Sequence, residues 1–106
     1  MTIERTDVLW FEARTDYSVD EVAELSGLPV SLLTGLVEAG ALPAHRLSVT
    51  LRLEAETVTL ARAARRLHEH FELDADGLAV AVSLLRRVRS LESELSAARA
   101  RSGRAD

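Results

Sequence analysis

The chain has 106 residues, no cysteine and a formal net charge of −4, which excludes a disulfide framework, a thiolate nucleophile and a cysteine-based metal site. Its 47% apolar and 28% charged residues are typical of a globular domain, and no apolar run approaches the roughly 18 residues of a membrane span. Because the N-terminal sequence also lacks a signal-peptide pattern, we expect a cytoplasmic protein consisting of one domain extended by a long helix.

Charge is distributed unevenly along the chain. Residues 1–56 contain ten acidic residues and four arginines, a net charge of −6, whereas residues 57–106 contain seven acidic residues and nine arginines, a net charge of +2. An acidic first half is repelled by DNA and is attracted to a basic protein surface.

The first predicted elements are a short strand and a helix. The apolar run at residues 8–11 (VLWF) indicates an edge strand, whose Trp10 and Phe11 we assign to the core rather than to a stacking platform. Ser18 and Glu21, three residues apart, form the pattern of a capping box at the start of a helix. Gly27 suits the left-handed position that ends this helix.

A second short helix follows, with Pro29 in its first turn. Gly40 ends it, and Pro43 prevents it from resuming. Two short helices joined by a short loop form a helix-turn-helix. Its apolar stripe consists of Leu32, Leu33, Leu36 and Val37.

This helix-turn-helix contains no basic residue. Residues 17–42 contain four carboxylates and neither Arg, Lys nor His. A helix that enters a DNA groove normally meets phosphates with Arg or Lys, and here the second helix offers only the hydroxyls of Ser31 and Thr34. DNA is therefore an unfavourable partner for this motif.

Residues 47–53 alternate between apolar and polar side chains, which predicts one half-buried strand. The 8–11 strand could pair with it as a small wing, although no Asn-Gly or Asp-Gly turn fixes its partner. The apolar positions of the alternation are Leu47, Val49, Leu51 and Leu53.

Two longer helices complete the chain. The first is expected at residues 55–71, with Leu60, Ala64, Leu67 and Phe71 on one stripe. Asp74 or Asp76 then caps a helix that reaches about Arg101. Between Leu78 and Leu85 this helix is apolar nearly all round, so we expect it to be buried on several sides. The chain thus divides into a head at 1–54, a two-helix arm at 55–101 and a disordered tail at 102–106.

A narrow apolar stripe continues along the last helix. Its members are spaced alternately three and four residues apart, as in the a/d seam of a coiled coil. The flanking charges have both signs and are compatible with pairing to a copy of the same chain. We therefore predict a homodimer, the alternative being that the seam folds back on the 55–71 helix. The seam consists of Ala81, Leu84, Val88, Leu91, Leu95 and Ala98.

Few residues form a pattern typical of catalysis or metal binding. His68 and His70 are two residues apart, so they point to different sides of a helix, and a solvated polar face explains His68 and Glu72 better than a metal site. Capping and surface charge explain the carboxylates better than acid–base catalysis. No phosphate-binding loop or nucleophile elbow is present. We predict no enzymatic activity, no cofactor and no metal.

Six arginines on the two long helices allow two interpretations. They form either a basic stripe or a solvated helical face, and we favour the solvated face. They are Arg62, Arg65, Arg66, Arg86, Arg87 and Arg89.

The order of these features resembles two related protein groups. Residues 17–42 (YSVDEVAELSGLPVSLLTGLVEAGAL) resemble the MerR-type helix-turn-helix. Residues 60–76 (LARAARRLHEHFELDAD), with the Leu-rich helix that follows to Leu95, resemble the chaperone-modulator CbpM family. The resemblance covers residues 17–101 and implies a mainly α fold, in which a MerR-like winged helix-turn-helix head precedes a long coiled-coil-type helix. The wing segment RLSVTLRLEAE departs from the family because it lacks the aromatic residue often seen there.

The resemblance also implies a function. CbpM-type proteins bind the J-domain of a DnaJ/CbpA-type co-chaperone and limit its stimulation of the Hsp70 DnaK. Because J-domains present a basic helix, an acidic competitor is physically sensible. The alternatives are a MerR-family DNA-binding transcriptional regulator, and an adaptor whose long helix recruits an unrelated partner.

Two acidic groups are candidates for the contact with a J-domain, and no spacing rule chooses between them. The first group consists of Asp20, Glu21, Glu24 and Glu38. The second group consists of Glu69, Glu72, Asp74 and Asp76.

Overall fold

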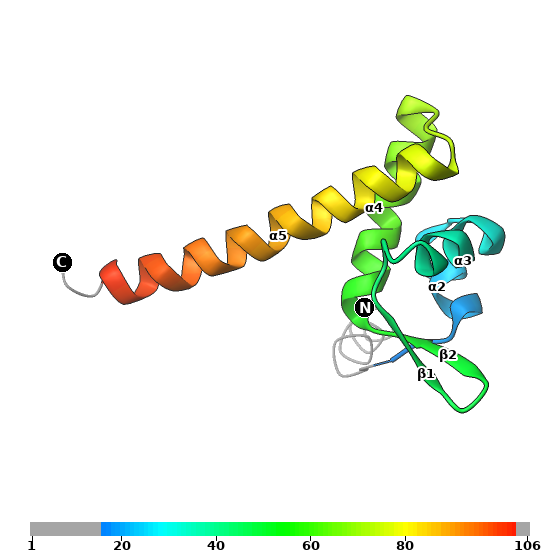
Figure 1. The fold of residues 1–106 in the computed structure, drawn as a ribbon, viewed down its shortest axis with the longest axis horizontal. Helices are drawn as coiled ribbons and strands as arrows, with labels where there is room; N and C mark the ends of the chain where they lie inside the picture. Colours follow the sequence, from blue (N-terminus) through cyan, green and yellow to red (C-terminus); the bar gives the residue numbers. More distant parts are fainter. Residues whose placement is uncertain (1–15, 104–106) are drawn as a thin grey trace, which may run out of the picture.

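The structure is a computed structural model that describes residues 16–103 (Figure 1). Within these residues, four helices and one β-hairpin form a mainly helical fold, as the sequence predicts. A head gathers α2, α3, the hairpin and α4, and α5 leaves this head as a long projection. The elements are α2 (Val19–Ser26), α3 (Val30–Glu38), β1 (Ala44–Leu47), β2 (Thr50–Leu53), α4 (Ala55–Phe71) and α5 (Ala75–Gly103).

The helix-turn-helix has the predicted ends. The Ser18 hydroxyl accepts a hydrogen bond from the Glu21 amide at 3.1 Å, and the Glu21 carboxylate accepts one from the Ser18 amide at 2.8 Å. The capping box is therefore present. Gly27 and Gly40 take left-handed φ angles of 80° and 79°, just beyond the ends of α2 and α3. Pro29 immediately precedes α3.

The wing differs from the predicted single strand. β1 and β2 pair antiparallel, with Leu47 opposite Thr50, and Ser48 and Val49 form a two-residue turn between them. Ser48 has a φ of 58°, the left-handed region that two-residue hairpin turns require. The apolar alternation at residues 47–53 was therefore misleading, because Leu47 is 55% and Val49 87% exposed at the hairpin tip. The predicted 8–11 strand lies outside the described residues.

Tyr17, which lies two residues before α2, forms backbone hydrogen bonds with β2 of the wing. Its amide donates to the Leu53 carbonyl at 2.7 Å, and the Leu53 amide donates to the Tyr17 carbonyl at 2.8 Å. Beside this bridge, the Arg52 guanidinium pairs with the Asp16 carboxylate at 3.1 Å. β2 is therefore bonded to the segment that precedes α2, while β1 is connected to α3 through the chain itself.

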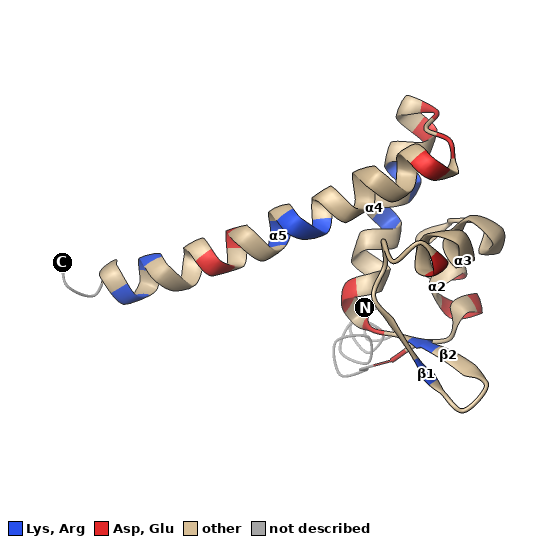
Figure 2. Cartoon of the chain, viewed as in Figure 1, with Lys and Arg blue, Asp and Glu red and all other residues tan. Residues whose placement is uncertain are grey.

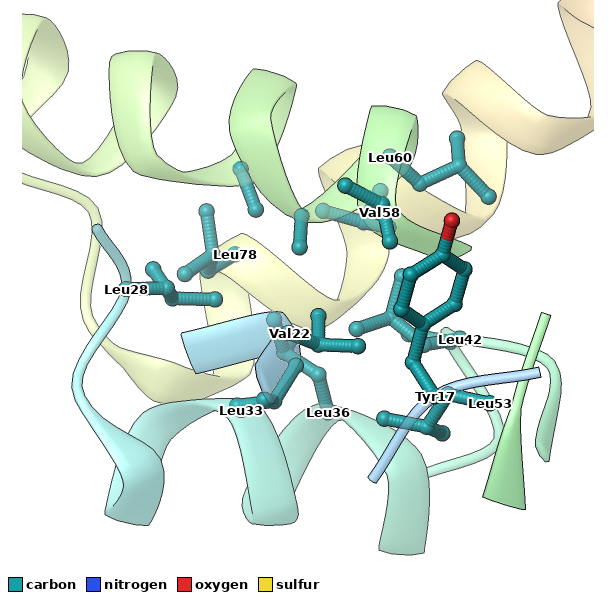
Figure 3. Packing of buried hydrophobic residues seen from close by; sticks show 14 residues of the cluster. Tyr17, Val22, Leu28, Leu33, Leu36, Leu42, Leu53, Val58, Leu60 and Leu78 are labelled. Carbon is teal, nitrogen blue, oxygen red and sulfur yellow. The ribbon is translucent and has the colours of Figure 1, made fainter. Parts of the chain in front are cut away.

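One buried cluster holds these elements together (Figure 3). It takes side chains from α2, α3, β2, α4 and the start of α5. The core therefore extends across residues 54 and 55, where the sequence suggested the division between head and arm. Burying a side chain such as Leu or Val contributes about 1.5–3 kcal/mol. The largest of the fully buried residues include Tyr17, Leu28, Leu33, Leu36, Leu53, Leu60 and Leu78.

The long helices agree closely with their predicted bounds. α4 covers Ala55–Phe71, and the Asp74 carboxylate accepts from the Gly77 amide at 2.8 Å, which identifies Asp74 as the cap of α5. α5 continues through residues 102 and 103, which belong to the predicted disordered tail and are helical instead, and residues 104–106 lie outside the described part. Within residues 16–103, no helix has the length and apolar composition to cross a membrane.

The first half of α5 is buried on one side only, which corrects the expectation of burial on several sides. Leu78 and Val82 are fully buried, but Val80 and Leu84 are each 61% exposed. The reason is that α4 and α3 pack on one part of this helix and leave the rest uncovered. Phe71, predicted on the inner stripe of α4, is likewise exposed.

The second half of α5 has no packing partner among the described residues. Every residue from 90 to 103 is exposed, including Leu91 and Leu95. The seam therefore does not fold back on α4 over this stretch. With 29 residues and a rise of about 1.5 Å per residue, α5 is about 44 Å long.

Candidate interaction surfaces

Two of the six arginines that were expected on a solvated helical face instead bind backbone carbonyls at the carboxyl ends of the short helices. Arg62 donates to the Leu25 carbonyl at 3.2 Å, near the end of α2. Arg86 donates to the Gly40 and Ala41 carbonyls at 3.1 and 3.3 Å, just beyond the end of α3. Carbonyls at a helix end lack partners within the helix and favour a positive charge nearby. These arginines therefore fix α2 and α3 to the long helices.

A third arginine covers the glycine that ends α2. A Cβ atom on Gly27 would lie 2.8 Å from Cδ of Arg65, whose guanidinium pairs with Glu69 at 3.1 Å. Among the described residues, no hydrogen bond or ion pair engages Arg66, Arg87 or Arg89. Three of the six arginines are thus engaged by other groups of the chain, which argues against the alternative of a continuous basic stripe for DNA.

We expect Gly27→Ala to lower the free energy of unfolding by at least about 1 kcal/mol, because a positive φ and the Arg65 side chain both oppose a Cβ atom there. The matched control is Gly35→Ala in α3, where a Cβ atom meets nothing within 4 Å and alanine should stabilise by about 0.5–1 kcal/mol. Urea denaturation of both variants measures the difference. Equal stabilities would contradict the role assigned to Gly27.

The first acidic group does not act as one patch of four equivalent carboxylates. Asp20 and Glu24 are exposed and four residues apart, so they lie on the same side of α2. Glu21 is half-buried and is used in the capping box. Glu38 is exposed but is the last residue of α3. We call the exposed pair Asp20 and Glu24 the α2 surface.

The second acidic group lies at the turn between α4 and α5, which we call the acidic joint (Figure 2). All four of its carboxylates are exposed, but two have structural partners: Asp74 caps α5, and Glu69 pairs with Arg65. Glu72 and Asp76 remain open to solvent. The His68 ring lies 3.0 Å from the Leu73 carbonyl and helps to hold the turn. Within residues 16–103, no three metal-ligating side chains gather in one place.

An apolar groove lies between α4 and α5 and was not predicted from the sequence. It has a volume of about 590 Å³. Ala63, Leu67 and Phe71 of α4 form one wall, and Leu84 and Val88 of α5 contribute to the other. We call it the α4–α5 groove. One feature of the sequence indicated such a groove: residues 78–85 of α5 are apolar on more sides than one packed helix can cover.

One protein family matches this arrangement. The model of the family described as MerR HTH family regulatory protein matches residues 17–100. The match includes the helix-turn-helix, the wing, α4 and nearly all of α5. No curated protein is similar enough to this chain to count as a relative. Since the family model covers well over half of the sequence, the chain belongs to the MerR helix-turn-helix family of regulatory proteins.

Proposed function

We propose that this chain is a chaperone modulator that binds the J-domain of a DnaJ/CbpA-type co-chaperone and limits its stimulation of Hsp70 (DnaK). Membership of a family of regulatory proteins supports a non-catalytic role. The resemblance of residues 60–95 to the CbpM family supports the choice of partner. The observation that carries the proposal is a helix-turn-helix whose charged side chains are all acidic.

The electrostatics of the head favour a basic protein over a nucleic acid. Asp20 and Glu24 are exposed on α2, and Glu38 is exposed at the end of α3. On β2 of the wing, the charge of Arg52 is paired with Asp16. The negative charges of a phosphate backbone would be repelled by these carboxylates. A basic helix would instead be attracted and oriented by them. Occupying the basic helix of a J-domain would prevent it from contacting Hsp70.

Calorimetric titration of the whole chain with J-domains from the same organism tests this proposal. We expect binding that weakens as ionic strength rises from about 0.01 to 0.15 M, because the Debye length falls from about 30 to 8 Å. J-domain-stimulated ATP hydrolysis by Hsp70 should fall when the chain is added. A J-domain whose basic helix carries reversed charges serves as the control. Failure to bind any of the organism's J-domains would refute the proposal.

DNA-binding regulation is the second candidate, and the family match is the observation that favours it. A recognition helix usually reads bases with Arg, Lys, Asn or Gln, and α3 contains none of them. On the wing, Arg46 is exposed but Arg52 is paired with Asp16. Tight, sequence-selective gel shifts with DNA flanking the gene, and a slope of log K against log salt near −0.9 per phosphate contacted, would support this candidate instead.

We also propose that the chain forms a homodimer through the seam on α5. Four large aliphatic side chains of the seam remain 45–61% exposed on the projecting helix: Leu84, Val88, Leu91 and Leu95. A row of this kind on one helix face is the surface that coiled coils bury. Covering it with a second helix would remove a continuous apolar stripe from water.

A further inference from the structure

A second pocket lies where α5 passes the end of α3 and the start of α4, and we call it the polar pocket. It has a volume of about 390 Å³, within the range of small-molecule sites. Basic residues of α5 gather nearby, where the helix leaves the head (Figure 2). The pocket shares no residue with the α4–α5 groove or the seam. It is lined by Gly40, Glu56, Ser83, Arg86, Arg87 and Ser90.

One arginine of the polar pocket is held in place by the head. Nη1 of the half-buried Arg86 donates to the Gly40 and Ala41 carbonyls at 3.1 and 3.3 Å. Both bonds use the same nitrogen, so the N–H groups on Nη2 and Nε have no partner among residues 16–103. Because the side chain is already fixed, little conformational entropy is lost when these groups bind a ligand.

The other donors of the polar pocket are unused or weakly used. Within the described part of the chain, no hydrogen bond or ion pair engages Ser83 or Arg87. Ser90 donates only a long bond of 3.5 Å, to Glu94. Ser83, Arg87 and Ser90 follow one another at spacings of four and three residues, so they lie on one side of α5. Guanidinium groups and hydroxyls that converge in this way are the donors that bind phosphate.

Glu56 restricts which phosphate compound fits. Its carboxylate is exposed at the start of α4, and no residue of the described chain pairs with it. A carboxylate only accepts hydrogen bonds, so it repels a bare anion and favours a ligand that also carries hydroxyl groups. The lining described above contains no aromatic side chain on which a base could stack. A small sugar phosphate therefore fits better than a nucleotide.

We propose that the polar pocket binds a small phosphate monoester that carries hydroxyl groups. Arg86 and Arg87 pair with its phosphate, Ser83 and Ser90 donate to the phosphate oxygens, and Glu56 accepts from a hydroxyl. The bound ligand connects α5 to the start of α4 beside the end of α3, so it stabilises the junction between α5 and the head. This site is separate from the α2 surface and from the seam, and it depends on neither a J-domain nor a dimer.

A chemical-shift titration by NMR, which detects weak binding and locates it, tests this proposal. The whole chain is titrated in phosphate-free buffer with glycerol phosphate, inorganic phosphate and glycerol. Glycerol phosphate should bind at least about threefold more tightly than inorganic phosphate, since it adds hydrogen bonds to Glu56. Glycerol should not bind. The amides of Gly40, Glu56 and residues 83–90 should shift. No saturable shifts at millimolar glycerol phosphate, or shifts confined to other residues, would overturn the inference.

Substitution of one arginine separates the pocket from a general effect of charge. Arg87→Ala should weaken binding of glycerol phosphate at least about tenfold, the loss expected for a hydrogen bond to a charged group. Arg99→Ala removes the same charge from an exposed position farther along α5, so it should leave the affinity unchanged. Equal losses in the two variants would show that only net charge is sensed and would refute the assigned site.

Glu56→Ala tests the choice of ligand. This variant lacks both the repulsion of inorganic phosphate and the acceptor for a hydroxyl, so the two phosphates should bind with equal affinity. A preference for glycerol phosphate that survives the substitution would contradict the contact assigned to Glu56. Circular dichroism of the three variants should match that of the native chain, because each replaces an exposed side chain.

Discussion

The Asp20→Lys, Glu24→Lys variant is expected to bind a J-domain at least about 100-fold more weakly than the native chain. Both side chains are exposed on one side of α2, so the two substitutions convert an attractive surface into a repulsive one. Most of the loss at low salt should appear in the association rate. Biolayer interferometry at two ionic strengths measures the affinity and the rate.

The matched control is Glu72→Lys with Asp76→Lys, which changes the net charge by the same amount at the acidic joint. This variant should keep at least about one third of the native J-domain affinity, because only the long-range field is altered. Circular dichroism should show both variants folded, since losing Asp20 from the first turn of α2 costs only about 0.3–1 kcal/mol. If the two variants bind equally well, the α2 surface is not the contact.

Leu91→Glu is expected to leave the chain monomeric. Leu91 lies at the middle of the seam and is 45% exposed in the single chain, so the substitution places two charges within the dimer interface without disturbing the head. Burying an unpaired carboxylate costs several kcal/mol per ion, more than a short coiled coil can offset. Light scattering should give a mass near 11.6 kDa for the variant, and twice that mass for the native chain.

Ser93→Glu provides the comparison for this result. Ser93 lies on the same exposed stretch of α5 but away from the seam, so its substitution should leave the mass and the thermal stability of the native chain unchanged. The seam would be rejected as the interface if Leu91→Glu and the native chain had the same mass.

The elements set by local chemistry could be predicted from the sequence. The Ser18–Glu21 capping box and the glycine that ends α2 involve residues only a few positions apart, so the sequence alone is enough to predict them. A wing was predicted, but its hairpin of two short strands could not be, because Ser48 and Val49 are not the residues that usually form a two-residue turn. Ser48 takes its positive φ as part of the paired hairpin, and no short pattern signals this.

The candidate surfaces were predictable in composition but not in detail. The sequence shows which residues are acidic, but the structure shows that Glu69 pairs with Arg65 and that Asp74 caps α5. The bonds from Arg62 to Leu25 and from Arg86 to Gly40 join residues 37 and 46 positions apart. Such distant pairs depend on how the helices pack, and the periodicity of the sequence does not predict them.

The arginines at the helix ends have a consequence for anyone who wishes to turn this head into a DNA reader. Substituting Arg62 or Arg86 would remove the side-chain donors to the backbone carbonyls at the ends of α2 and α3. New basic side chains would have to be added to the exposed positions of α3 and to the hairpin tip, while the existing arginines are kept. Specificity for nucleic acid and stability of the head are thus separable engineering problems, each with its own set of positions.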